Sequence, residues 1–264
     1  LVRKKNVVNT MMTSIFIIGV GIVMWVLFGY SLSFAPSGNA FIGDFRWLGL
    51  EGVSLTEGYT DDASIPNMVF SAFQMMFAVI TPALITGAVA GRMKFKSIFV
   101  FTIFWSLIVY YPLAHMVWGQ GGLLGADGIG ALDFAGGDVV HISSGVSALV
   151  LCILLGKRHD YEHSIYRIHN IPTVVLGASL LMFGWFGFNA GSALAADGIA
   201  AHAFMTTGVS AAAAMLSWML CDVIKNKKPT LIGASTGMVA GLVGITPGAG
   251  FVPMWAAVII RSEE

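Results

Sequence analysis

The chain is short of charge. Asp, Glu, Lys and Arg make up only 11% of its 264 residues, whereas about 25% is usual for a soluble domain. Hydrophobic residues make up 56%, and the acidic and basic residues balance at 14 each. Such a composition excludes an ordinary soluble protein. The balanced charge by itself says nothing about partners, because the distribution of charge matters more than its sum, and we expect no nucleic acid among them. The composition predicts a membrane protein whose partner is the lipid bilayer.

Cysteine and the usual signatures of enzymes are also scarce. Cys152 and Cys221 lie in or at the end of apolar segments, so we expect small core residues rather than a disulfide or metal pair. No nucleophile–base pair or nucleotide motif is visible, so the sequence predicts no enzyme activity and no cofactor. His159, His163 and His169 cluster in sequence, but their charged surroundings favour a solvated loop over a metal site.

Long apolar runs are what the chain has in quantity. A membrane-spanning helix needs about 20 such residues. Seven segments reach that length: 9–30, 65–90, 97–118, 134–156, 171–192, 201–223 and 230–246. An eighth begins near Phe251 and stops after Ile260, about half a span. We therefore expect an all-α fold, a polytopic transmembrane helical bundle over 1–264, truncated at both ends.

Positive charge predicts the orientation of the spans. Twelve of the 14 Lys and Arg residues fall in every second loop, which marks those loops as cytoplasmic. The exceptions are Arg46 and Arg261. The opposite loops are neutral or acidic, and the longest, 31–64, is expected to form an outer cap rather than a domain. The basic residues are Arg3, Lys4, Lys5, Arg92, Lys94, Lys96, Lys157, Arg158, Arg167, Lys225, Lys227 and Lys228.

A few polar and aromatic residues stand out within the spans. His141 is predicted about seven residues into the fourth span, and an ionisable residue at that depth favours a functional role. Phe73 and Phe77 are four residues apart and share a helix face, as do Phe188 and Ser192. Aromatic rings attract a desolvated cation, a hydroxyl accepts one of its hydrogens, and a buried imidazole relays a proton. The pattern suits capture of a small cation and passage of its neutral form.

Each of these residues also has a purely structural interpretation. Trp118, at the outer end of the third span, is typical of an interfacial aromatic belt. Phe73 and Phe77 at helical spacing are typical of core packing, and Asp133 is typical of a helix N-cap. We expect a hydrogen-bonded structural role for His115. Asn189 and Thr246 are expected to satisfy neighbouring backbone groups. Gly233, Gly237 and Gly241 form a small-residue stripe that predicts close helix contact.

Three motifs together resemble the ammonium transporter (Amt/Mep/Rh) family, nearer its bacterial Amt branch. They are Asp133-Phe-Ala-Gly-Gly-Asp-Val-Val-His141, Ala114-His-Met-Val-Trp118 and Gly184-Trp-Phe-Gly-Phe-Asn-Ala-Gly-Ser192. The similarity runs over essentially the whole chain. It implies an eleven-helix inverted-repeat fold with one pore per subunit of a homotrimer, in the cell inner (plasma) membrane. The chain would carry seven full helices and part of an eighth.

The resemblance also implies roles for individual residues. Trp118, Ser192 and Phe73 would bind the ammonium substrate at an outer recruitment site. Phe77 and Phe188 would form the stacked pore gate below that site. His141 would be the first of two pore histidines, and Asp133 would support the site without touching the cation. A PII-type regulator would dock at the cytoplasmic loops in members that have one.

The sequence departs from the family pattern in two respects. The second pore histidine would lie beyond residue 264, so transport is expected of a longer protein rather than of this piece alone. Asp138 stands where the family commonly has a small residue, three positions before His141. If the two side chains are close, its charge would raise the proton affinity of the histidine. An ammonium sensor, signalling through a cytoplasmic partner domain, is the alternative function, and a Rh-type gas channel is a weaker one.

Overall fold

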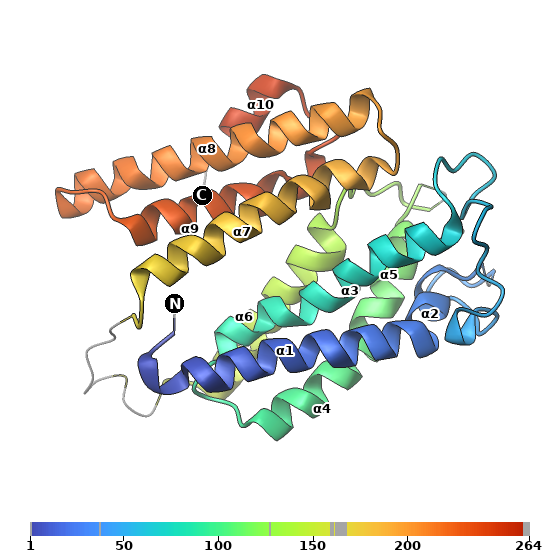
Figure 1. Cartoon of the computed structure of the whole chain (residues 1–264), viewed down its shortest axis with the longest axis horizontal. Helices are drawn as coiled ribbons and strands as arrows, with labels where there is room; N and C mark the ends of the chain where they lie inside the picture. The colour runs from blue at the N-terminus through green and yellow to red at the C-terminus, as the bar shows by residue number, and fades with distance from the viewer. Residues whose placement is uncertain (1, 37, 127, 159–160, 162–167, 261–264) are drawn as a thin grey trace. The chain divides into compact units, whose positions relative to one another are not determined.

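The computed structural model describes residues 2–36, 38–126, 128–158, 161 and 168–260, and in them the chain is all-helical. One antiparallel bridge, between Gly58 and Pro66, is the only β pairing among these residues. The α-helices are α1 (Val7–Met24), α2 (Tyr30–Phe34), α3 (Asn67–Val89), α4 (Phe95–Trp105), α5 (Tyr111–Trp118), α6 (Ser143–Leu155), α7 (Ile171–Ala190), α8 (Gly198–Asn226), α9 (Leu231–Ile245) and α10 (Met254–Ile259) (Figure 1).

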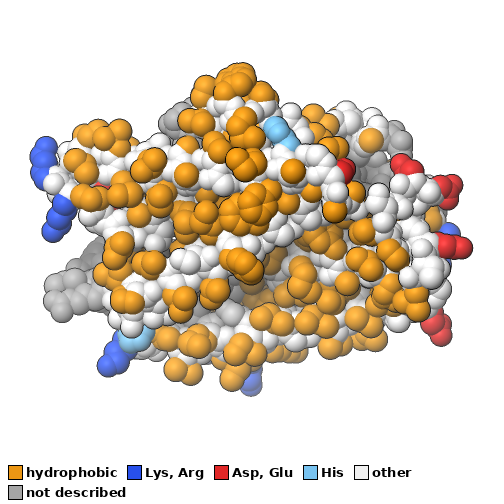
Figure 2. Space-filling view, turned by 45° about the horizontal axis from the view of Figure 1, so that its top comes forward, with side chains coloured by type: hydrophobic (Ala, Val, Ile, Leu, Met, Phe, Trp, Pro, Cys, Tyr) orange, Lys and Arg blue, Asp and Glu red, His pale blue; other side chains and the backbone are white. Residues whose placement is uncertain are grey.

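The described residues contain seven continuous helices that are long and apolar enough to cross a membrane, as predicted. They run over Lys4–Phe34, Asn67–Val89, Phe95–Trp118, Gly137–Leu155, Ile171–Ala193, Gly198–Asn226 and Leu231–Gly248. The eighth predicted segment forms the short helix α10. Large apolar side chains on the flanks of these helices are exposed, such as Phe183 at 79%. Figure 2 shows apolar side chains over the flanks and charged ones near the helix ends.

Three of these long helices contain a π-helical segment among the described residues. The segments are Trp25–Gly29, Ser106–Tyr110 and Gly137–Ile142. The first joins α1 to α2, the second joins α4 to α5, and the third precedes α6. A π turn holds one residue more than an α turn and occurs frequently at functional sites. The third segment contains His141.

The chain divides into two compact units. The N-terminal unit comprises Val2–Leu132 and Asp138–His169, and the C-terminal unit comprises Asp133–Gly137 and Asn170–Glu264. In the N-terminal unit, α3 packs against both α1 and α6. Trp105 of α4 donates its indole N–H to the Ser147 hydroxyl of α6 at 2.9 Å, which ties a fourth helix to the group.

Arg92 joins the ends of two helices in the N-terminal unit. Its Nη1 donates to the Gly156 carbonyl, just after α6, at 2.8 Å. Its Nη2 donates to the Ala88 carbonyl of α3 and to Sγ of Cys152 in α6, the latter at 2.9 Å. Cys152 is half-buried, in line with the expected packing role, whereas Cys221 is exposed on α8. The prediction of a core residue was therefore wrong for Cys221, because α8 turns that flank outward.

In the C-terminal unit, α8 and α9 lie side by side (Figure 1), and the predicted glycine stripe lies at their contact. A Cβ on Gly237 would lie 2.7 Å from the Ala214 carbonyl oxygen, and one on Gly241 would lie 2.5 Å from that of Ser210. Only glycine permits this approach. Each helix also begins with a side-chain cap, since Asp197 accepts from the Ala200 N–H and Thr230 from that of Gly233.

Candidate functional site

An aromatic cluster lies where α3 and α5 meet in the N-terminal unit. The rings of Phe73 and Phe77 are 4.8 Å apart and meet edge to face. Phe77, which is 1% exposed, meets Trp118 in the same way at 5.8 Å. Such pairs contribute about 0.5–1.5 kcal/mol beyond their burial. The structure therefore brings together three of the predicted residues, although the sequence placed them in two separate spans.

Phe188 and Ser192 lie in the C-terminal unit, at the end of the span Ile171–Ala193. The Phe188 ring packs 5.1 Å from that of Trp185. The Ser192 hydroxyl donates to the Phe188 carbonyl at 2.8 Å. Because its hydrogen is used in that bond, the Ser192 oxygen presents its lone pairs to any further partner. The shared helix face is confirmed, and the hydroxyl is oriented as an acceptor.

Asp133 is 8% exposed and precedes the helix Gly137–Leu155 by a few residues. One carboxylate oxygen accepts the backbone N–H groups of Gly136 at 2.7 Å and Gly137 at 2.6 Å. This arrangement satisfies N–H groups at the start of the helix, as a cap does. It agrees with the structural interpretation, in which Asp133 acts through the backbone.

His141 is half-buried, and its helix begins at Gly137, three residues later than the predicted boundary. The imidazole therefore lies roughly 6 Å from that end of the helix rather than the predicted 10 Å. The Ser143 and Ser144 hydroxyls donate to the Val139 and Val140 carbonyls, each at 2.6 Å. These bonds satisfy carbonyl groups of the π turn that holds His141. The suggested pairing of His141 with Asp138 stays a prediction.

His115 has the structural role that the sequence suggested. It is fully buried in α5, with Nδ1 3.1 Å from the Ser33 carbonyl oxygen and Nε2 2.8 Å from that of Asn39. Its own carbonyl accepts the Gly119 N–H at 2.9 Å, which ends α5 directly after Trp118. The ring thus holds the chain at Ser33 and Asn39 against the helix that carries Trp118.

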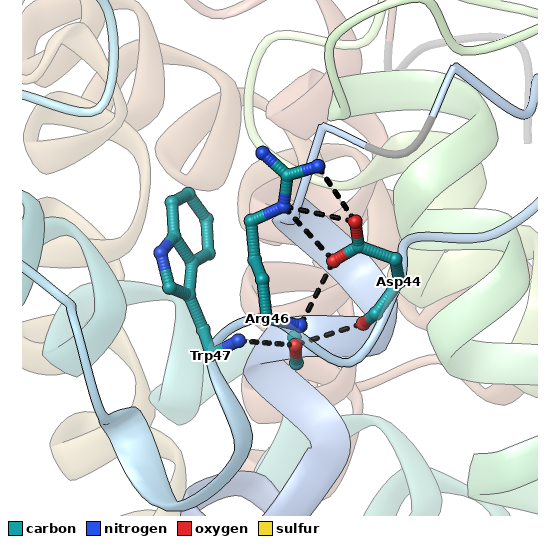
Figure 3. Close-up of polar contacts among 4 residues, drawn as sticks. Asp44, Arg46 and Trp47 are labelled. Atoms are coloured by element: carbon teal, nitrogen blue, oxygen red, sulfur yellow. Dashed lines mark hydrogen bonds and ion pairs between the residues drawn. The ribbon is translucent and has the colours of Figure 1, made fainter.

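The 31–64 loop also contains contacts that the sequence did not predict. Figure 3 shows Arg46 paired with Asp44, with Nη2 and Oδ2 2.7 Å apart. The Ser31 hydroxyl donates to the Asp44 carbonyl at 2.8 Å and accepts the Trp47 N–H at 2.9 Å. Hydrogen bonds from Arg46 hold the pKa of Asp44 below its ordinary value. Arg46, an exception to the charge rule, is thus neutralised by its neighbour.

Tyr59 anchors the same loop. Its ring stacks on Phe70 at 4.7 Å, and its hydroxyl donates to the Phe34 carbonyl at 3.0 Å. The hydroxyl also accepts the Gln120 N–H at 3.2 Å. Burial raises the pKa of Tyr59 to about 12, so the phenol stays protonated and keeps donating. No local sequence signal marks these contacts, because their partners lie far along the chain.

The described residues contain no group of three His, Cys, Asp or Glu side chains that could hold a metal ion. Of the predicted loop histidines, His159 and His163 lie outside the described residues, and His169 lies inside them. The predicted functional residues fall in both units. Phe73, Phe77, Trp118 and His141 belong to the N-terminal unit, and Asp133, Phe188 and Ser192 to the C-terminal unit.

Seven apolar helices, with an aromatic cluster, an oriented hydroxyl and a histidine inside their spans, define a multi-pass membrane protein with polar and aromatic groups at membrane depth. The comparison with known families makes this specific. The chain belongs to the Ammonium Transporter Family, whose model matches residues 1–261. The relatives are named as transporters, a role that is not enzymatic.

The similarity covers nearly all of this chain but only part of its relatives. The chain is 52% identical to an ammonium transporter of Bacillus subtilis, over 98% of this chain and 63% of that protein. It is 42% identical to ammonium transporter Amt1 of Archaeoglobus fulgidus, again over 63% of the relative. The chain thus spans about three-fifths of the length of these curated relatives.

Solved structures share the fold. The crystal structure of Saccharomyces cerevisiae Mep2 superposes with a TM-score of 0.86 at 38% identity, over 96% of this chain and 57% of that one. A structure titled Sensor Amt Protein gives 0.83 at 29% identity, over 99% and 65%. The sensor alternative is not favoured, because the more similar curated relatives are named ammonium transporters.

Proposed function

We propose that the protein, together with the further helices its relatives carry, moves ammonium across the inner (plasma) membrane of the cell. The observation that carries the proposal is the contact of Phe73, Phe77 and Trp118 in a chain of this family. The seven spans support passage through a bilayer. We further propose a homotrimer, and docking of a PII-type regulator on the cytoplasmic loops.

Recruitment of the cation follows from the chemistry of three side chains. Trp118 and Phe73 offer aromatic faces, each of which attracts a desolvated ammonium ion by about 0.5–2 kcal/mol. The Ser192 oxygen, oriented by its bond to the Phe188 carbonyl, accepts an N–H of the ion. Asp133 supports the site from a distance, because its carboxylate is used by backbone N–H groups.

Passage beyond the recruitment site requires loss of the charge. Phe77 and Phe188 would form a dry gate. An ion that enters the gate loses its hydrogen bonds to water, and the apolar rings offer none in their place. Ammonium therefore gives up a proton near the gate, and ammonia continues as the neutral species. The imidazole of His141 then hydrogen-bonds the ammonia or relays the proton. A second histidine, in the part of the relatives beyond this chain, would continue that path.

The test is the current in proteoliposomes after an ammonium pulse. A version extended to the length of its relatives is expected to give current, and residues 1–264 alone are expected to give none. His141→Ala should abolish the current of the extended version. No current and no ammonium uptake from a folded extended version would contradict the proposed function.

The recruitment site has a test of its own. Trp118→Leu in the extended version should raise the half-saturating ammonium concentration by about 2- to 30-fold, the equivalent of one cation–π contact. Trp255→Leu is the matched control, because Trp255 is 68% exposed on α10 and should leave the half-saturating concentration unchanged. Equal effects of the two variants would remove Trp118 from the site.

A further inference from the structure

Asn189 has an amide group whose orientation is fixed by its neighbours. It is fully buried in α7, one residue after Phe188. Its Nδ2 donates to the Thr207 hydroxyl oxygen of α8 at 2.9 Å. The Thr207 hydroxyl donates its own hydrogen to the Ala203 carbonyl at 2.6 Å, so its oxygen must accept from Asn189. The carbonyl oxygen Oδ1 therefore points away from Thr207.

That oxygen has no hydrogen-bond partner among the described residues. The sequence suggested that Asn189 would satisfy neighbouring backbone groups. Instead, its amide nitrogen bonds the Thr207 side chain, and its amide oxygen bonds neither a backbone group nor a side chain among the described residues. Buried side-chain polar atoms in folded proteins are hydrogen-bonded in the large majority of cases. Asn189 lies inside the membrane span Ile171–Ala193, where lipid chains supply no donor. Oδ1 therefore has acceptor capacity that the described residues do not use, and a small molecule with an N–H group could use it.

The position of this oxygen indicates which small molecule that is. Asn189 and Ser192 are three residues apart on one helix, so they are neighbours on its surface. At about 1.5 Å per residue, Oδ1 lies roughly one turn deeper than the Ser192 oxygen, which is itself oriented as an acceptor. Phe188 directly precedes Asn189 in sequence. Two acceptors in succession beside an aromatic ring fit a small molecule with several N–H bonds.

We propose that Oδ1 of Asn189 accepts a hydrogen bond from ammonium or ammonia at the level of Phe188, after the molecule leaves Ser192. The proposal rests on the proposed function and adds a residue to its path. An ammonium ion that loses its water at a ring of Phe keeps one hydrogen bond through this carbonyl. The step from the outer site into the gate is then less costly than a passage between apolar rings alone.

The test compares Asn189→Leu with Thr207→Val in the extended protein. Asn189→Leu removes the acceptor at nearly constant volume and should lower ammonium turnover per folded molecule by about tenfold, as expected for one lost hydrogen bond. Thr207→Val removes the bond between α7 and α8 but keeps Oδ1, so turnover should stay within about threefold of wild type. Folded protein is counted by size-exclusion chromatography before reconstitution.

A second variant separates binding from structure. Asn189→Asp keeps an oxygen at this position and adds negative charge, so the half-saturating ammonium concentration should fall. A purely structural role, as a tie between α7 and α8, predicts no such fall. This variant also decides the matter if Asn189→Leu does not fold.

Three results would overturn the assignment. Equal losses in Asn189→Leu and Thr207→Val would make Asn189 a structural tie. Unchanged turnover in Asn189→Leu would mean that a water molecule, and not the transported species, occupies the acceptor. If wild type carries no flux, the proposed function fails, and stabilisation by ammonium chloride in thermal unfolding then tests Asn189 by itself: equal stabilisation of wild type and Asn189→Leu would exclude binding.

Discussion

Single residues in the 31–64 loop show how a charge is neutralised by its neighbour. Asp44 and Arg46 are two positions apart, and the guanidinium donates to both carboxylate oxygens. The backbone N–H of Arg46 donates to the same carboxylate at 2.9 Å. These bonds favour the ionised form, which is why the pKa of Asp44 lies below its ordinary value of 3.8.

The pair has a predictable pH dependence. Because the pKa of Asp44 is lowered on folding, the pair stabilises the folded loop fully above the ordinary carboxyl pKa, and this contribution is lost as the pH falls through the lowered value. Arg46→Gln should raise the pKa of Asp44 toward 3.8. A carboxyl-carbon NMR titration measures this, and Lys94→Gln is a control. A titration curve unchanged by Arg46→Gln would show that backbone bonds alone set the pKa.

At the scale of helices, the two units use different means of close packing. In the C-terminal unit, glycines on α9 let the backbone of α8 approach. In the N-terminal unit, polar side chains join the helices, as Trp105 joins Ser147. Small residues and interhelical hydrogen bonds are the main sources of helix association in lipid, where the hydrophobic effect is absent. Substitutions of the glycines at the α8–α9 contact should therefore lower the stability of the protein strongly.

The glycine contact predicts a contrast between two alanine variants. Gly237→Ala should lower the stability of the protein in detergent by about 1–3 kcal/mol, because the new methyl group meets the α8 backbone. Gly177→Ala is the control, since a Cβ there has nothing within 4 Å. Alanine is the better helix former by about 1 kcal/mol, so Gly177→Ala should be neutral or stabilising. Equal thermal midpoints for the two variants would contradict the contact.

At the scale of the whole molecule, the charge pattern and the helices agree. With seven spans, the positive charges predict the basic loops on the cytoplasmic side of the membrane and the acidic 31–64 loop on the opposite side. Two single-cysteine variants test this orientation in a background with Cys152→Ala and Cys221→Ala. Lys227→Cys should react with a membrane-impermeant maleimide only after the cells are opened, and Glu51→Cys should react in intact cells. Labelling in the reverse sense would invert the predicted orientation.

Long elements were predictable from the sequence because hydropathy alone determines them in a bilayer. The seven predicted spans match the helices, with the largest difference in the first, which extends from Lys4 to Phe34 instead of 9–30. The site was predictable only in part. The spacing of Phe73 and Phe77 predicted their shared face, but the contact of Phe77 with Trp118 depends on how two helices cross.

Contacts between distant polar residues were beyond sequence reasoning. Trp185 donates to the Thr246 hydroxyl across 61 positions, and Tyr59 reaches Gln120 across the same separation. Asn189 shows the limit most clearly, because nothing local distinguishes an amide that bonds the backbone from one that bonds Thr207. The π turns were also invisible, since one extra residue per turn leaves the hydropathy of a span unchanged.

The π turn at Gly137–Ile142 has a consequence for how the span tolerates changes in length. An α-helix advances about 100° per residue, and the extra residue of this π turn, which is the first turn of its helix, offsets the start of the helix relative to α6 by that amount. Removing one residue inside this turn would restore the regular α ladder without shifting α6 against its neighbours. The strain of the deletion would fall on the turn that contains His141. The helix α6 would keep its contacts with its neighbours, and only the direction of the His141 imidazole would change.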